Sequence, residues 1–221
     1  MRALLYGLAG MVLVTILLNM LFPLPDTIRY SQIVTAEDGT VVHAFLSWDD
    51  KWRMKTELEE ISPALRKAII YKEDRWFYWH AGINYPAILR AAYNNLVQRR
   101  RTSGASTITM QVARLLEPRR RTVWSKCIEL FRAGQLEWWY SKDEILQMYL
   151  NLVPYGGNIE GVKSASLLYY DRLPYTLSLA QITALSIIPN RPTSLRIGVN
   201  DALLLRERNK WLRRMKRDAV F

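Results

Sequence analysis

The stretch SPALRKAIIYKEDRWFYWHAG (residues 62–82) marks the point where the apolar pattern of this chain takes on a helical period. Ser62 is a typical N-cap residue, and Pro63 suits the first helical position, where its missing N–H needs no partner. The spacing predicts a helix over 63–74. The pattern stays helical to the C-terminus and predicts further helices at 85–100, 106–117, 122–140, 142–151, 160–169, 178–188 and 200–216.

Upstream of residue 62 the pattern is that of short strands. Residues 31–54 alternate apolar and polar side chains around Asp38-Gly39, a strong turn signal for a β hairpin. A second turn at Asp49-Asp50 predicts a third short strand. The fold class is therefore mostly α, with a small N-terminal β hairpin.

The N-terminus carries an uncharged run of 20 residues, from 3 to 22. At a rise of about 1.5 Å per residue, a helix of this length matches a hydrocarbon core of about 30 Å. A cleavable signal peptide is the alternative, but Arg2 is the only basic residue before the run, and no small-x-small cleavage site follows it. We expect a transmembrane anchor over 1–25 and one domain over 26–221. The flanking charges do not decide the orientation.

The formal net charge is +11 at pH 7, which indicates an anionic partner such as lipid head groups, a phosphorylated lipid or nucleic acid. Basic clusters occur at 99–101, 119–121 and 206–217, and each could also be a solvated helix face. The sequence contains no zinc-finger spacing and no aromatic RNA-binding signature, so nucleic acid is not expected. The single cysteine, Cys127, excludes an intrachain disulfide.

Glu73 and Asp74 stand directly before the four aromatic residues 76–79. One interpretation is a helix end with charges in water and rings in the core. The other is that the rings remove water from the Glu73 carboxylate, which would make it a proton acceptor near neutral pH. These residues alone leave both interpretations open.

Two further segments contain polar residues at helical spacing. In GASTITMQ (104–111), Ser106 and Thr107 at a helix start could bind an anion, and Thr107, Gln111 and Arg114 would share one face. Ordinary capping with a solvated stripe explains the same pattern. On the next helix, Lys126 and Glu129 are three residues apart, so they form either a plain ion pair or part of a site.

Taken in order, these motifs resemble one family. The stretches EDRWFYWHAGIN, GASTITMQVARLL, SKCIELFRAGQLE and SKDEILQMYLNLVPYGGNIEGVKSAS are similar to the successive motifs of glycosyltransferase family 51. These are the peptidoglycan glycosyltransferases of class A penicillin-binding proteins and of monofunctional transglycosylases. The resemblance covers about residues 31–215.

The resemblance implies a lysozyme-like, two-lobed helical domain that polymerises lipid II into glycan strands with inversion at the donor carbon. It places the catalytic domain on the outer (periplasmic) face of the bacterial cytoplasmic membrane. Expected partners are lipid II, the growing undecaprenyl-pyrophosphate-linked strand and the membrane, and other cell-wall synthesis proteins are compatible with it. No cofactor is required and no metal-binding residue is implied, although a divalent cation (Mg²⁺ or Mn²⁺) is compatible with the chemistry.

The family's residue roles carry over by position. Glu73 matches the general base, and Glu129 matches the second catalytic carboxylate. Lys126 matches the basic residue beside the leaving pyrophosphate. The remaining positions match substrate-binding residues, and these are Asp74, Phe77, His80, Ser106, Thr107, Gln111 and Arg114.

The chain departs from the family pattern at three places. Ser125 replaces the first member of an Arg-Lys pair, Met110 replaces the first of two glutamines, and Arg206-Glu207-Arg208 replaces an Arg-Arg motif. No S-x-x-K motif occurs, so no transpeptidase domain is expected in these residues. Two alternatives remain at this stage. One is a lysozyme-like lytic hydrolase, and the other is a catalytically weak scaffold of the cell-wall machinery.

Overall fold

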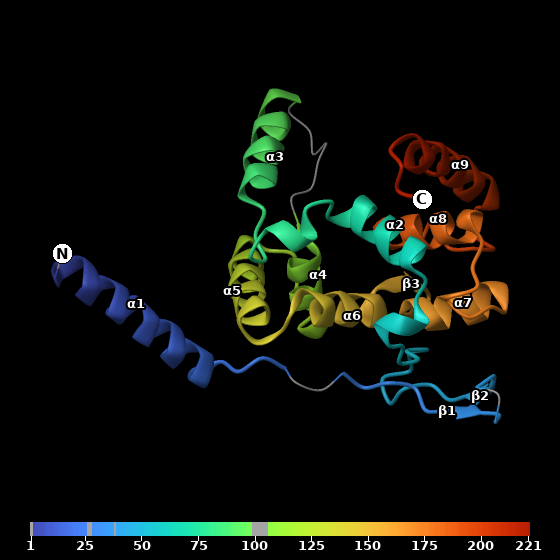
Figure 1. Ribbon diagram of the computed structural model, residues 1–221, viewed down its shortest axis with the longest axis horizontal. Coiled ribbons are helices and arrows are strands. Elements are labelled where there is room, and N and C mark those ends of the chain that lie inside the picture. The colour runs from blue at the N-terminus through green and yellow to red at the C-terminus, as the bar shows by residue number, and fades with distance from the viewer. Residues whose placement is uncertain (1, 26–27, 38, 99–105) are drawn as a thin grey trace.

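The computed structural model describes residues 2–25, 28–37, 39–98 and 106–221 (Figure 1). The chain is mostly helical, with two small antiparallel β pairs. The helices are α1 Arg2–Leu21, α2 Pro63–Glu73, α3 Tyr85–Gln98, α4 Ile108–Leu116, α5 Val123–Trp139, α6 Lys142–Leu152, α7 Val162–Tyr170, α8 Leu179–Ile187 and α9 Asp201–Arg217. Short 3-10 turns occur at Leu58–Glu60, Phe77–Trp79 and Ile188–Asn190.

The helix predictions are confirmed to within two residues at each described end. Local capping interactions explain why the helix ends could be predicted from the sequence. Ser62 accepts a hydrogen bond from the Leu65 N–H, and capping boxes form at Ser141 with Glu144 and at Ser178 with Gln181. The last two residues of the predicted helix 85–100 and the basic cluster 99–101 lie outside the described residues.

The strand predictions are partly wrong. The hairpin β1 Ile33–Thr35 and β2 Val41–Ala44 forms as expected, although Asp38 of its turn lies outside the described residues. The segment after Asp49-Asp50 forms no third strand of this hairpin, because Trp52 bridges instead to Ile159. That residue belongs to a second pair, β3 Pro154–Gly156 and β4 Ile159–Glu160, which the sequence reading missed.

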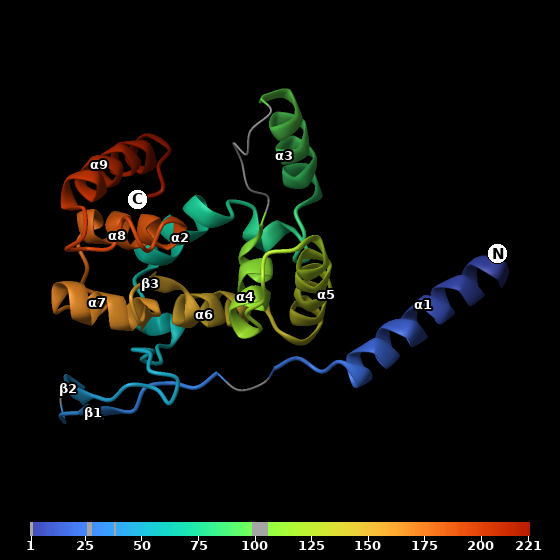
Figure 2. The same cartoon turned by 180° about the vertical axis from the view of Figure 1, so that it is seen from behind.

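The helices surround one apolar core. Helix α4 packs against α5 and α6, whereas α8 packs against α2 and α9. Figure 2 shows α4 lying between α5 and α6 from behind. Helix α3 stands away from the rest in both ribbon views. The largest fully buried side chains are Tyr149, Tyr155, Phe77, Ile61, Leu65, Ile69, Ile108, Met110, Leu136, Ile145, Leu146 and Leu150.

Buried polar clamps attach the N-terminal segment to the helical body. The Arg53 guanidinium donates to Glu160 Oε2 at 2.7 Å and 2.8 Å, to Asp49 Oδ2 at 2.9 Å and to the Arg29 carbonyl at 2.7 Å. The Asn151 side chain accepts from the Thr56 N–H and donates to the Thr56 carbonyl, both at 2.9 Å. Such fully satisfied buried groups fix one arrangement of segments that are distant in sequence.

Helix α1 spans 20 residues, as the uncharged run predicts. In the part of the chain that the structure describes, no helix meets the length and apolarity needed to cross a membrane. The predicted transmembrane anchor is therefore not confirmed and stays a prediction.

Candidate active site

Glu73 is the last residue of α2, and its side chain is only 11% exposed. Gln111 Nε2 on α4 donates to Glu73 Oε2 at 3.1 Å, and the Asn190 amide donates to Glu73 Oε1. The Lys72 ammonium lies 3.7 Å from Glu73 Oε1 and donates to Asn190 Oδ1 at 2.8 Å. Three different segments therefore orient one carboxylate, as a residue that handles a proton requires.

The aromatic run does not bury Glu73 in the way the sequence suggested. Phe77 is fully buried, but Trp76 and Trp79 are 57% and 84% exposed. The 3-10 turn at Phe77–Trp79 explains the difference, because so short a turn directs only one of its rings into the core. Glu73 is instead covered by polar neighbours, Gln111 of α4 and Asn190 of the turn after α8.

Three ionisable groups near Glu73 have pKa values that respond both to their own burial and to the Glu73 charge. Burial raises the pKa of the Tyr149 and Tyr155 hydroxyls, and the negative charge of Glu73 raises both further. Burial lowers the pKa of the Lys72 ammonium, and the Glu73 carboxylate offsets part of that effect. Both tyrosine hydroxyls are buried and have no hydrogen-bond partner among the described residues.

Asp74, His80 and Thr107 form the frame that positions α2 against α4. Asp74 Oδ2 accepts from the Ile108 N–H at 3.0 Å, and His80 Nε2 lies 2.9 Å from the same oxygen. Thr107 caps α4 by accepting from the Met110 N–H at 3.1 Å, and its hydroxyl donates to the Gly82 carbonyl at 2.6 Å. The Asp74 and Thr107 oxygens are therefore used within the protein, whereas His80 Nδ1 is buried and has no hydrogen-bond partner among the described residues.

The second carboxylate, Glu129 on α5, lies in a separate cluster. Lys126 Nζ donates to Glu129 Oε2 at 2.8 Å and to Ser106 Oγ at 3.0 Å. Arg114 Nη1 lies 4.0 Å from Glu129 Oε1. Two cations share one carboxylate, and Arg114 and Lys126 keep 34% and 43% of their side chains exposed. The cluster thus has net positive charge and can accept an anion from solution.

One helix connects the two clusters. Gln111 and Arg114 are three residues apart on α4 and so share a face. Gln111 contacts Glu73, whereas Arg114 approaches Glu129. The predicted common face is confirmed for these two residues, but the Thr107 hydroxyl turns instead to Gly82. The face of α4 that carries Gln111 and Arg114 therefore contacts both carboxylates, Glu73 at one position and Glu129 one turn further along.

Two residues of the Glu73 cluster were not predicted, Lys72 and Asn190. Asn190 is 117 positions from Glu73 in the sequence and lies in the turn after α8. The only local signal was the turn composition of PNRP (189–192), which predicts a loop and not a contact with α2. Lys72 could have been noticed as the direct neighbour of Glu73.

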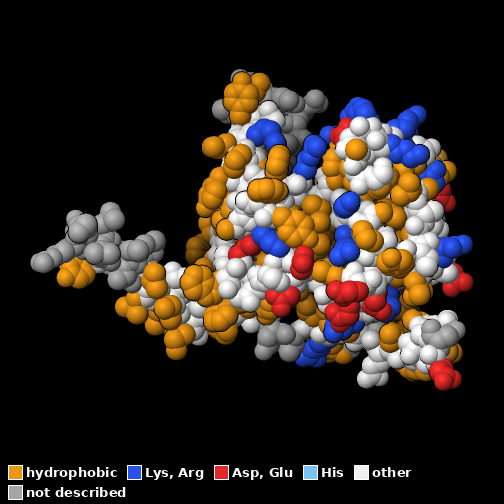
Figure 3. All heavy atoms as spheres, viewed as in Figure 1, with side chains coloured by type: hydrophobic (Ala, Val, Ile, Leu, Met, Phe, Trp, Pro, Cys, Tyr) orange, Lys and Arg blue, Asp and Glu red, His pale blue; other side chains and the backbone are white. Residues whose placement is uncertain are grey.

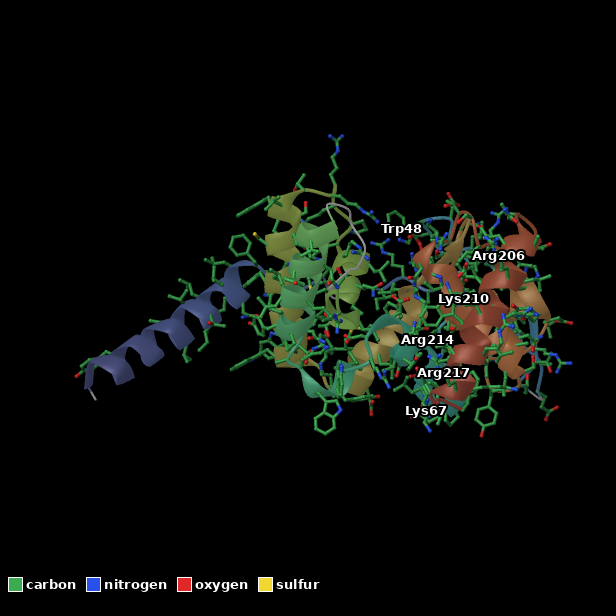
Figure 4. The ribbon with its side chains drawn as sticks, turned by 90° about the horizontal axis from the view of Figure 1, so that it is seen from above. Trp48, Lys67, Arg206, Lys210, Arg214 and Arg217 are labelled. Atoms are coloured by element: carbon green, nitrogen blue, oxygen red, sulfur yellow. The ribbon has the colours of Figure 1, made fainter. Side chains whose placement is uncertain are left out.

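The basic segment 206–217 forms most of α9. Figure 4 shows Arg206, Lys210, Arg214 and Arg217 following one another along this helix, with Lys67 of α2 near its C-terminal end. The Lys210 and Arg217 side chains are 71% and 74% exposed. Arg206 is exposed as well, and among the described residues it forms no hydrogen bond or ion pair with Glu73 or Glu129.

Neither Glu73 nor Glu129 belongs to a cluster of metal ligands within the described residues. Across the ranges that the structure describes, no group of three or more His, Cys, Asp or Glu side chains could hold an ion. Glu73 and Glu129 each have protein cations or amides as partners instead.

Comparison with known proteins identifies the family of this chain. The sequence profile of the family described as Transglycosylase matches residues 38–216. The chain therefore belongs to the transglycosylase family. It is 41% identical over 202 residues to penicillin-binding protein 1C of Escherichia coli (strain K12), which covers 91% of this chain and 26% of that protein. From the sequence alone, the stretches HAFLSWDDKWR (43–53) and PYGGNIEGV (154–162) are interpreted as similar to this 1C type.

Other relatives show the same relationship. Penicillin-binding protein 2D of Bacillus subtilis (strain 168) is 36% identical over 84% of this chain and 26% of its own length. Penicillin-binding protein 1A of Escherichia coli (strain K12) is 36% identical over 74% of this chain and 19% of its own length. The chain thus spans about a quarter or less of these relatives.

Proposed function

We propose that this chain is a peptidoglycan glycosyltransferase that polymerises lipid II. The observation that carries the proposal is that one face of α4 contacts two carboxylates of different character. Gln111 orients Glu73, and Arg114 and Lys126 make the surroundings of Glu129 cationic. A transfer from a sugar pyrophosphate needs both parts, a proton acceptor for the attacking hydroxyl and a cation for the departing phosphates.

In the proposed step, the 4-hydroxyl oxygen of the acceptor N-acetylglucosamine attacks C1 of the donor N-acetylmuramic acid. Glu73 takes the hydroxyl proton as the new C–O bond forms. The bond between C1 and the pyrophosphate oxygen breaks, and undecaprenyl pyrophosphate leaves with the electron pair. Attack opposite the leaving group inverts the configuration at C1.

Lys126 and Arg114 would stabilise the charge that develops on the leaving pyrophosphate. Both have exposed surface from which to contact it, and Glu129 holds both side chains in place. Ser106, which accepts from Lys126, extends the same polar surface. Asp74, Phe77, His80 and Thr107 would act through the frame that fixes α2 and α4, and not by direct contact with the reacting atoms.

The proposal includes a place in the cell. Lipid-linked substrates stay in the membrane, so we place residues 1–25 as an anchor in the cytoplasmic membrane and residues 26–221 on its outer face. The projecting helix α3 would belong to the smaller of two lobes in a lysozyme-like division. Other cell-wall synthesis proteins are compatible partners.

Incubation of the full chain with lipid II in detergent tests the proposal. Formation of polymeric glycan with release of undecaprenyl pyrophosphate supports it. Cleavage of preformed glycan without polymerisation would identify a lytic hydrolase instead. Binding of lipid II without either reaction would indicate a scaffold.

A further inference from the structure

Lys72 contacts three different segments close to the Glu73 carboxylate. Its side chain is only 10% exposed. The ammonium donates to Asn190 Oδ1 at 2.8 Å, lies 3.7 Å from Glu73 Oε1 and lies 4.8 Å from the centre of the Trp211 ring. Removing a lysine from water is costly unless its charge finds such partners, so these contacts are what permits a charged side chain here.

Lys72 selects the orientation of the Asn190 amide. Asn190 is exposed, so packing alone does not fix its side chain. Its oxygen accepts from the Lys72 ammonium, and its nitrogen donates to Glu73 Oε1. An ammonium can only donate, so it favours the amide orientation in which the NH₂ group faces the carboxylate. Without the ammonium, the amide would be free to turn its oxygen toward Glu73.

Helix α9 supplies a further contact to Lys72. Trp211 is half-buried and packs against the apolar core, which holds its ring in place. The Lys72 ammonium and the Arg214 guanidinium both lie over this ring, at 4.8 Å and 5.0 Å from its centre. The negative face of an indole ring attracts cations, most strongly where water is excluded. The Tyr71 hydroxyl donates to Asp218, just after α9, and so ties the same two helices together.

The charge of Lys72 depends on the charge of Glu73. Figure 3 shows Lys and Arg side chains gathered over α9, at the upper right of the molecule. Burial lowers the pKa of the Lys72 ammonium, the Glu73 carboxylate raises it, and two arginines lower it again. The charged and titratable groups near this pair on other elements are Arg114 of α4, Tyr149 of α6, Tyr155 of β3, Arg191 after α8 and Arg214 of α9.

We propose that Lys72, held by Trp211, is a positioning residue for the proposed base. It orients the Asn190 amide toward Glu73, and its charge favours the ionised form of the Glu73 carboxylate. The inference rests on the proposed function, because it names the residues that prepare the base of that same site. An ion pair that only stabilised the fold would leave the pH dependence of the site unchanged.

The pH profile of lipid II polymerisation by the full chain tests the role of Lys72. Lys72→Met removes the charge and keeps a long side chain, so Glu73 is protonated more easily. The midpoint of the low-pH limb should therefore move up by about one pH unit. At pH 7 kcat should fall several-fold, with little change in KM. Lys72→Arg keeps the cation and should keep the wild-type limb, as should Lys67→Met, which removes an exposed charge from the same helix.

A matched pair of substitutions tests the role of Trp211. Trp211→Leu keeps an apolar side chain but removes the ring under the ammonium, so the limb should move in the same direction by about half a pH unit. Trp48→Leu is the control, because it removes a ring 4.0 Å from the Arg29 guanidinium and outside both carboxylate clusters. An unshifted limb in Lys72→Met, or equal profiles for the two tryptophan variants, would overturn the proposal.

A titration without substrate separates this inference from the proposed function. In the full chain in detergent micelles, NMR of carbon-13-labelled glutamate follows each carboxyl group, and the signal missing from Glu73→Gln belongs to Glu73. Its titration midpoint should rise by about one pH unit in Lys72→Met. That rise in a chain that does not polymerise lipid II would support the positioning role and reject the proposed function. Polymerisation with an unchanged Glu73 midpoint would overturn the positioning role alone.

Discussion

Gln111 Nε2 lies 3.1 Å from Glu73 Oε2, and this hydrogen bond joins the first turns of α4 to the last residue of α2. Its geometry does not depend on Gln111 alone. Thr107 caps α4, and Asp74 accepts from the Ile108 N–H at the same helix start. The direction in which Glu73 faces is therefore set by the docking of one helix end on another.

Gln111→Leu removes the donor while keeping a similar side-chain volume. The Glu73 carboxylate then loses one of its two amide partners, and the kcat of lipid II polymerisation should fall by about tenfold, the usual effect of one lost hydrogen bond to a charged group. KM should change little. Gln147→Leu on α6, remote from both clusters, serves as the control, and an equal loss in that variant would show a general effect on folding.

Lys126→Ala tests the cationic cluster. Because Lys126 has 43% of its side chain exposed and would contact the leaving phosphates, its loss should lower kcat by about tenfold or more while changing substrate affinity less. Lys67→Ala removes an exposed lysine from α2 and is the matched control. If both variants lose activity equally, Lys126 is only a solvated helix charge.

Glu117→Gln tests the ion pair between Glu117, which follows α4, and Arg132 of α5. Arg132 also donates to the carbonyls of Phe22 and Pro23, just after α1. Burial alone would raise the pKa of Glu117, but hydrogen bonds from Arg132 and Arg119 lower it overall from its ordinary value of 4.5. A carboxyl group with a lowered folded-state pKa stabilises the fold above pH 4.5, and that contribution is lost as the pH falls through the folded-state value.

The wild type should therefore exceed Glu117→Gln in unfolding free energy by about 0.5–1 kcal/mol at pH 7, because solvent screens a partly exposed ion pair. The difference should shrink below pH 4.5 and vanish in stronger acid. Denaturant unfolding at several pH values measures it. A difference that is the same at pH 7 and at pH 3 would mean that the charge of Glu117 contributes nothing.

Gly161 is required by its backbone and by its surroundings. Its φ is +82°, and a Cβ atom would lie 2.7 Å from the Asn151 carbonyl oxygen. Gly161→Ala should destabilise the fold by roughly 2–4 kcal/mol. Gly134, inside α5, has no atom within 4 Å of an added Cβ, so Gly134→Ala should stabilise by about 0.5–1 kcal/mol. Thermal unfolding checks both predictions: the melting temperature should fall for Gly161→Ala and rise for Gly134→Ala.

Much of the fold could be predicted because the relevant signals are local. Five helices begin at an N-cap residue whose side chain accepts a hydrogen bond from the backbone N–H three residues later. These N-cap residues are Ser62, Thr107, Thr122, Ser141 and Ser178. The pair β3–β4 was missed because each of its strands is too short to show alternation. The bridge from Trp52 to Ile159 was missed because it depends on tertiary packing.

The candidate site could be proposed from the sequence as a set of residues but not as a geometry. Spacing on one helix correctly paired Lys126 with Glu129 and placed Gln111 and Arg114 together. It could not show that the Trp76 and Trp79 rings stay exposed, because a 3-10 turn, and not a continued helix, follows Asp74. Nor could it bring Asn190 to Glu73, since that contact needs the packing of α8 on α2.

The central claim is that Glu73 accepts the proton, and Glu73→Gln tests it most directly. The variant keeps the shape of the side chain but removes the basic oxygen, so lipid II polymerisation should fall by at least about 10²-fold and lose its descending limb at low pH. Binding of a moenomycin-type phosphoglycolipid should survive, because the Lys126 and Arg114 cluster is intact, and Glu59→Gln at an exposed remote position should behave as wild type. Polymerisation by Glu73→Gln at a near wild-type rate, with the same low-pH limb, would contradict the account.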